Sequence, residues 1–192
     1  MGKHLKEGMV FQIPLWGNFG YAYAKYIIFE NTRQKYEAIK IYCTHTKTKN
    51  VNLNDLDLSS YIYQPILLAG SRVIMRKKIW EVIGKVDVTE EEHIIPDFKY
   101  IDSWDKSFFL TKNLLNRTPI EFEKVKHLED EAYIASGNIE IRTTITFIEK
   151  EGKKVEDYLD LTNENVAYRY KIKDTIYTLD DIPKQYWGKA KD

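Results

Sequence analysis

The amino-acid sequence predicts an α+β fold built mainly from antiparallel strands, with a small, strongly bent sheet or barrel on its N-terminal side. Hydrophobic residues make up 43% of the 192 residues and aromatic residues 14%, with 14 tyrosines among them. This composition is typical of an ordered, strand-rich chain rather than a disordered one. We predict a β domain over residues 1–111 and an α+β extension over residues 112–192, packed on the same core.

Residues 7–29 form the clearest element, a β-hairpin around which we expect the rest of the chain to be organised. Apolar residues in the first strand alternate between two faces over residues 9–15. Gly17 and Asn18 interrupt this run and tolerate positive φ, so they predict a tight reversal. The second strand places Ala22 and Ala24 on one face, where small side chains let another layer approach closely, as in an SH3-like barrel.

The chain then continues with shorter strands. Residues 36–43 alternate well enough for a third strand, residues 44–54 form a polar loop, and a short buried strand follows Pro65. Gly84, inside an apolar strand that begins near Ile79, indicates a bulge or a close backbone approach. A basic cluster precedes that strand and is interpreted as a solvated loop or as a phosphate-binding site: Arg72, Arg76, Lys77 and Lys78.

Both kinds of secondary structure are predicted after residue 106. Residues 107–115 are predicted to form the last strand of the barrel and the segment that leaves it. Thr118, followed by Pro119, matches a capping box, so a helix is expected from there to about Gly137. Residues 138–149 are dense in β-branched side chains and predict a strand. Residues 168–179 predict one more hairpin, turning at residues 173–174.

Charge and cysteine content restrict the possible partners and compartments. Lys plus Arg and Asp plus Glu each number 29, so no global field attracts the chain to nucleic acid or to an anionic membrane. Cys43 is the single cysteine, which excludes an intrachain disulfide and fits a reducing compartment. No apolar run is long enough to span a bilayer. We therefore expect a cytoplasmic protein with no membrane partner, for which nucleic acid is an unfavoured ligand.

The strongest local charge signal lies between residues 87 and 105, where Lys99 is the one Lys or Arg. Such a run is either a solvated face or a patch that steers a basic partner. Aromatic residues interleave with the acids, as they do where a charged rim surrounds the anchors of a protein interface. The candidate partner-binding residues are Asp87, Glu90, Glu91, Glu92, Asp97, Phe98, Tyr100, Asp102, Trp104 and Asp105.

No catalytic, metal or cofactor motif stands out. The four histidines are isolated from one another, and phosphate-loop, dinucleotide and nucleophile-elbow motifs are absent. Cys43 and His45 share a strand face, but a nucleophile also needs an orienting group and an oxyanion hole. The sequence therefore predicts a protein that is not an enzyme and has no cofactor. An unrecognised hydrolase is the third and weakest hypothesis.

Residues 6–27, KEGMVFQIPLWGNFGYAYAKYI, resemble the opening of the immunity protein 26 family, whose members are found beside bacterial polymorphic toxins. The likeness continues at Trp80–Gly84, at Pro96–Lys99 and at Trp104, and covers roughly residues 5–110. It implies a cytoplasmic inhibitor that binds a cognate toxin and protects the producing cell, and it carries no catalytic residues. An acidic patch would suit a nuclease toxin. The alternative is a small-barrel module that binds nucleic acid through its basic cluster and tyrosines.

Overall fold

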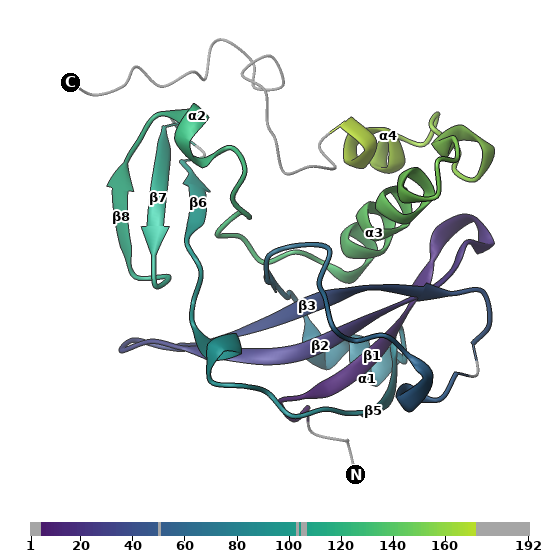
Figure 1. Ribbon diagram of the computed structural model, residues 1–192. Coiled ribbons are helices and arrows are strands. Elements are labelled where there is room, and N and C mark those ends of the chain that lie inside the picture. The colour runs from purple at the N-terminus through teal and green to yellow at the C-terminus, as the bar shows by residue number, and fades with distance from the viewer. Residues whose placement is uncertain (1–4, 50, 103, 105–106, 172–192) are drawn as a thin grey trace.

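The computed structural model describes residues 5–49, 51–102, 104 and 107–171. Its architecture is α+β with two antiparallel sheets, as the sequence predicted (Figure 1). The first sheet has the strand order β4-β3-β2-β1-β5, and the second has the order β6-β7-β8. Within the described residues the first sheet is open, with β4 and β5 at its edges, so it does not close into the barrel that was considered from the sequence.

The predicted hairpin is confirmed and lies at the centre of the first sheet. Strands β1 (Met9–Leu15) and β2 (Gly20–Glu30) pair in antiparallel register from Val10 opposite Lys25 to Leu15 opposite Gly20. The turn is a short 3-10 segment, η1 (Trp16–Asn18), in which Gly17 has φ of 63° and Asn18 has φ of 54°. The reversal therefore uses the left-handed conformations that these two residue types tolerate.

Both faces of the first sheet are buried, each by different parts of the chain. One face, here called the helix-covered face, packs against helix α3 (Ser136–Lys150) and the helix α1 (Ser71–Lys77). The other, the loop-covered face, lies beneath the segments 51–61 and 86–98. The helix-covered face carries the small residues that were expected to admit a second layer, and its core includes Phe11, Ile13, Ala22, Ala24, Ile39, Ile41, Ile139 and Ile145.

Helix α3 corrects the prediction of a strand over residues 138–149. The β-branched content favoured a strand, but Ile141, Ile145 and Ile148 also have the i, i+4, i+7 spacing of a helix face, and all three are buried. Packing against the sheet favours the helix over the strand. Residue Gly137, expected to end a helix, instead lies in the first turn of α3.

The remaining elements of the first sheet agree in part with the sequence. Strands β3 (Lys35–Thr46) and β4 (Ile66–Leu67) occur where strands were predicted. The 3-10 segment η2 (Leu53–Asp55) lies before β4, and β5 (Glu81–Lys85) follows α1. The β1/β5 register shifts between Val10 opposite Gly84 and Phe11 opposite Val82, so the irregularity predicted at this glycine is a bulge. The basic cluster, expected in a loop, lies on α1 and at its C-terminal end.

The second sheet was not anticipated as a separate unit. It contains β6 (Phe98–Ile101), β7 (Phe108–Lys112) and β8 (Asn116–Pro119), so the expected last barrel strand belongs here instead. The helix predicted from residue 118 is reduced to α2 (Phe122–Val125). The 3-10 segment η4 (Val155–Asp157) and helix α4 (Glu164–Lys171) follow α3. The first part of the hairpin predicted at 168–179 is therefore helical, and the rest lies outside the described residues.

Two buried polar contacts attach α3 to its surroundings. The Arg142 guanidinium donates to both oxygens of Glu129, at 2.9 and 2.7 Å, and both side chains are buried. Glu140 accepts hydrogen bonds from the indole nitrogens of Trp80, at 2.8 Å, and Trp16, at 3.2 Å. Burial raises the pKa of Glu140, and the two indole donors oppose that rise. These contacts do not test the domain boundary predicted between residues 111 and 112, which stays a prediction.

Gly17 gives a test of how tightly the hairpin turn packs. A Cβ at this position would lie 2.2 Å from the backbone oxygen of Tyr158, and φ is positive. We expect Gly17→Ala to lower the free energy of unfolding, measured by urea titration, by at least about 2 kcal/mol, through strain and overpacking. Gly137→Ala is the matched control. Its Cβ would meet nothing within 4 Å, so alanine should leave stability unchanged or raise it by about 0.5–1 kcal/mol. Equal effects of the two changes would contradict this view of the turn.

Candidate partner-binding surface

The acidic segment crosses the loop-covered face between β5 and β6, held there by a buried ion pair. Lys25 Nζ donates to both oxygens of Glu92, at 2.8 Å each, and to the backbone oxygen of Asp87, at 3.0 Å. The Tyr61 hydroxyl also donates to Glu92, and the Thr89 backbone N–H donates at 3.0 Å. These contacts fix residues 87–93, including the 3-10 segment η3 (Glu91–His93), against strand β2.

Glu92 was predicted to lie on the exposed rim, and this is wrong because the residue is only 8% exposed. Burial alone would raise its pKa, but the hydrogen bonds from Lys25, Tyr61 and the Thr89 backbone prevail and lower the pKa to about 2. The carboxylate is therefore charged and fully engaged at neutral pH. Its role is to position the loop, while its neighbours in sequence face solvent.

The rest of this segment, here called the acidic loop (residues 87–97), combines exposed carboxylates with an exposed aliphatic side chain. Ile94, which directly follows η3, is 70% exposed. A large exposed aliphatic residue within an acidic segment has the composition of a small protein-binding patch, in which an apolar centre is surrounded by charges that steer association. The exposed acids of this loop are Asp87, Glu90, Glu91 and Asp97.

Two of the three predicted aromatic anchors are not free surface residues. Phe98 is 0% exposed and packs in a cluster with Ile27, Phe29 and Leu114, so the prediction that it anchors a partner is wrong. Its ring joins β6 of the second sheet to the core of the first sheet. Tyr100 is half-buried, and the Arg117 guanidinium lies 3.4 Å from its ring centroid.

Trp104 fits the expected exposure but lies apart from the acidic loop. It is 89% exposed, and its backbone N–H donates to Asp102 at 2.7 Å. The acidic loop leads into β6 at its N-terminal end (Figure 1), whereas Asp102 and Trp104 come after the last residue of that strand, Ile101. The predicted residues are thus divided between two places, and Asp105 lies outside the described residues.

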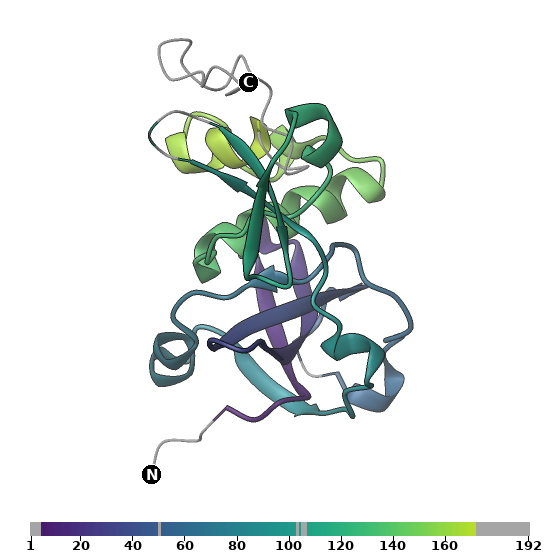
Figure 2. The same ribbon diagram turned by 90° about the vertical axis from the view of Figure 1, so that its left-hand side faces the viewer.

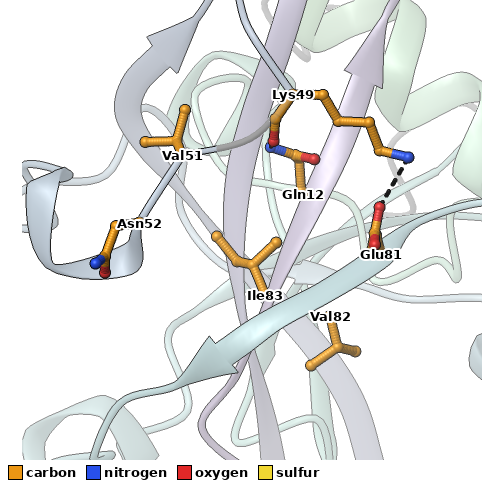
Figure 3. A pocket seen from close by; sticks show the side chains of 7 residues that line it. All are labelled: Gln12, Lys49, Val51, Asn52, Glu81, Val82 and Ile83. Atoms are coloured by element: carbon orange, nitrogen blue, oxygen red, sulfur yellow. Dashed lines mark hydrogen bonds and ion pairs between the residues drawn. The ribbon is translucent and has the colours of Figure 1, made fainter.

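A hollow on the loop-covered face was missed by sequence reasoning. It is open, has a volume of about 310 Å³, and lies between β1, β5 and the segment after β3 (Figure 3). Gln12 and Glu81 are directly opposite one another in the β1/β5 pair, which brings both to this face. The signal in the sequence was Gln12, a polar residue within an apolar strand. The lining residues are Gln12, Lys49, Val51, Asn52, Glu81, Val82 and Ile83.

The basic cluster lies on the other side of the first sheet. Ile74 of α1 packs into the core of the helix-covered face, and Figure 2 shows α1 on the opposite side of the sheet from the acidic segment. All four basic side chains are exposed, and none forms an ion pair with another residue in the part of the chain that the structure describes: Arg72, Arg76, Lys77 and Lys78.

Two of the histidines, His45 and His93, each lie beside a glutamate. His45 Nε2 is 2.7 Å from Glu151 Oε1, and its ring lies between those of Phe19 and Phe147. Burial lowers the pKa of His45, partly offset by the charge of Glu151. Across residues 5–49, 51–102, 104 and 107–171, no group of three or more metal-ligating side chains is found. No helix in the same ranges is long and apolar enough to cross a membrane.

Comparison with known families identifies the N-terminal region. The family model of immunity protein 26 (Imm26) matches residues 6–110, more than half of the 192 residues. The chain belongs to the Imm26 family. The resemblance noted from the hairpin and the later Trp and Pro positions is thereby confirmed. No significant match was found among curated proteins or among solved structures.

The Imm26 match contains both faces of the first sheet, the acidic loop and the hollow, and it ends within β7. Membership implies a cognate toxin as the partner and indicates a non-enzymatic inhibitor role. Helices α2, α3 and α4 follow the matched residues, and α3 nevertheless supplies the helix-covered face with its core.

Proposed function

We propose that this Imm26 protein neutralises a cognate bacterial toxin by binding it directly through the loop-covered face, in the cytoplasm of the producing cell. The observation that carries the proposal is the acidic loop itself. Four exposed carboxylates and the exposed side chain of Ile94 lie in this one loop, and the buried pair of Lys25 and Glu92 attaches the loop to the sheet. A rigid loop loses little conformational entropy on binding, which favours affinity.

The charge of this loop indicates a basic partner surface. Carboxylates on one face raise the association rate of an oppositely charged protein and make that rate sensitive to salt. A nuclease has a surface made for phosphate and is one toxin class that such a face would suit. Because the protein has zero formal net charge, this attraction depends on the local arrangement and is not a property of the whole molecule.

Charge reversal on the loop tests the proposal. We expect the triple variant Asp87→Lys, Glu90→Lys, Glu91→Lys to reduce the association rate constant for the toxin encoded beside it by roughly tenfold or more at low salt, and to flatten its salt dependence. Stopped-flow or surface-plasmon measurements at two salt concentrations provide the readout. A control with the same change in net charge reverses three exposed acids outside the acidic loop, Glu121, Glu123 and Glu156.

Equal rates in the two triple variants would rule out the acidic loop as the steering surface. No binding by folded wild-type protein would contradict toxin neutralisation for that pair. Retention of this non-binding protein on single-stranded DNA would instead favour the nucleic-acid module, with the exposed basic residues of α1 as its contact surface.

A further inference from the structure

Gln12 presents an unused hydrogen-bond acceptor to the hollow on the loop-covered face. The residue is only 2% exposed. The amide nitrogen donates to the Lys49 backbone oxygen at 2.6 Å and to the Tyr23 hydroxyl at 3.3 Å. Since a carbonyl oxygen can only accept, this contact fixes which end of the amide is nitrogen. Within the described residues nothing donates to Gln12 Oε1, which points away from the Lys49 carbonyl (Figure 3).

A carboxylate in a replaceable ion pair lies beside this acceptor. Glu81 is opposite Gln12 in the strand pair, and its Oε2 is 2.9 Å from Lys49 Nζ. The Glu81 and Lys49 side chains are 59% and 57% exposed. Exposed pairs of this kind contribute little to stability, so an incoming cation can take the place of Lys49 without a large cost to the fold.

The walls of the hollow are partly apolar. Val51 and Ile83 lie on the side away from the Lys49 and Glu81 charges (Figure 3). A ligand that suits the site therefore has a cationic end with several donors and an apolar stem. Among protein side chains, arginine combines a planar fork of N–H donors with a methylene stem that packs on apolar surface.

We propose that the hollow receives an arginine side chain from the bound partner protein, whose guanidinium donates to Gln12 Oε1 and to the Glu81 carboxylate. This inference rests on the proposed function, because the hollow and the acidic loop share the loop-covered face. In the β1/β2 register Gln12 is opposite Tyr23, two residues along β2 from Lys25, which holds Glu92. A partner bound to the acidic loop is thus close enough to reach the hollow.

A titration with small probes tests the site without the toxin. The full chain, labelled with ¹⁵N, is titrated with N-acetyl-arginine amide, with its neutral analogue N-acetyl-citrulline amide, and with N-acetyl-lysine amide. We expect saturable shifts confined to the Gln12 side-chain amide and the backbone amides of Val51 and Ile83, with the arginine probe binding at least tenfold more tightly than the citrulline probe. Equal responses to these two probes, or shifts outside the hollow, would overturn the proposal. Tighter binding of the lysine probe would also overturn the choice of arginine.

Two variants should change probe binding in opposite directions. Glu81→Gln removes the carboxylate and should weaken binding of the arginine probe about tenfold. Lys49→Met removes the resident cation and should strengthen it several-fold, while the Lys49 backbone carbonyl stays in place. The control is Glu30→Gln, which breaks a similarly exposed pair with Lys35, at 2.8 Å, and should change nothing. A general loss of folding could not produce both signs.

The toxin complex separates this inference from the proposed function. If wild-type protein binds the toxin and Glu81→Gln weakens that binding about tenfold relative to Glu30→Gln, both are supported. Equal affinities of the two variants would reject the arginine site and leave toxin binding intact. Failure of the wild-type protein to bind would reject toxin neutralisation, and the probe titration would then decide the chemistry of the hollow by itself.

Discussion

Replacing Glu92 with alanine should lower the free energy of unfolding by about 3–5 kcal/mol, because removing one partner of a buried ion pair leaves the other charge without compensation. The remaining partner would be Lys25, which is 6% exposed and has its Nζ in contact with both Glu92 oxygens. Tyr61 would lose the acceptor for its hydroxyl as well. Urea titration, monitored by circular dichroism, measures this loss in the free energy of unfolding.

Glu90→Ala and Glu91→Ala are matched controls for this prediction. Both residues are exposed neighbours of Glu92, and surface substitutions of this kind usually change stability by no more than about 0.5 kcal/mol. If all three alanine variants unfolded at the same urea concentration, the buried pair would not hold the loop as described. A loss of stability in the Glu92 variant alone would show that Glu92 positions the loop and that Glu90 and Glu91 are available to a partner.

Acid should weaken the same contact. The pKa of Glu92 falls from its ordinary 4.5 to about 2 in the folded protein. Its charged form therefore stabilises the fold fully above about pH 4.5, and this contribution is lost as the pH falls toward 2. We expect the free energy of unfolding of wild-type protein to fall more steeply across this window than that of Glu92→Gln. Parallel pH curves would contradict the assignment.

Glu92 also shows why the candidate surface could be predicted only in part. Residues 90–92 are identical in type, and local sequence gives no reason to separate them. The 3-10 segment η3 turns the third glutamate toward a lysine that lies 67 residues away along the chain. The position of Phe98 was equally ambiguous, since an aromatic residue in an acidic segment is consistent with an interface or with a core. Long-range packing decided both.

The fold was predictable where local signals agreed. In the hairpin, the period-two pattern and the residues Gly17 and Asn18 favoured the same structure, and the structure confirms it. In residues 138–149, β-branched content favoured a strand while apolar spacing allowed a helix, and only contact with the sheet resolved the conflict. The hollow is formed by three segments that are far apart in the sequence, so the polar residue Gln12 within an apolar strand was the one sequence signal for it.

A variant that ends at residue 111 should fail to fold, although it contains the whole Imm26 match. Removing α3 would expose the helix-covered face, where Phe11, Ile13, Ala22 and Ala24 are each 0% exposed in the intact protein. Trp80 would also lose Glu140 as its acceptor. We expect poor amide dispersion in ¹H–¹⁵N spectra and no cooperative urea transition, since a sheet with one bare apolar face does not bury enough surface for stability.

A variant that ends at residue 171 is the control for this truncation, because it keeps every described element. It should unfold in one cooperative step, with the same midpoint by tryptophan fluorescence and by circular dichroism. A well-dispersed, cooperatively unfolding 1–111 variant would instead show that the predicted β domain is independent. That outcome would allow toxin binding to be measured on the Imm26 region by itself, and α3 would then be an added layer on a domain that does not need it.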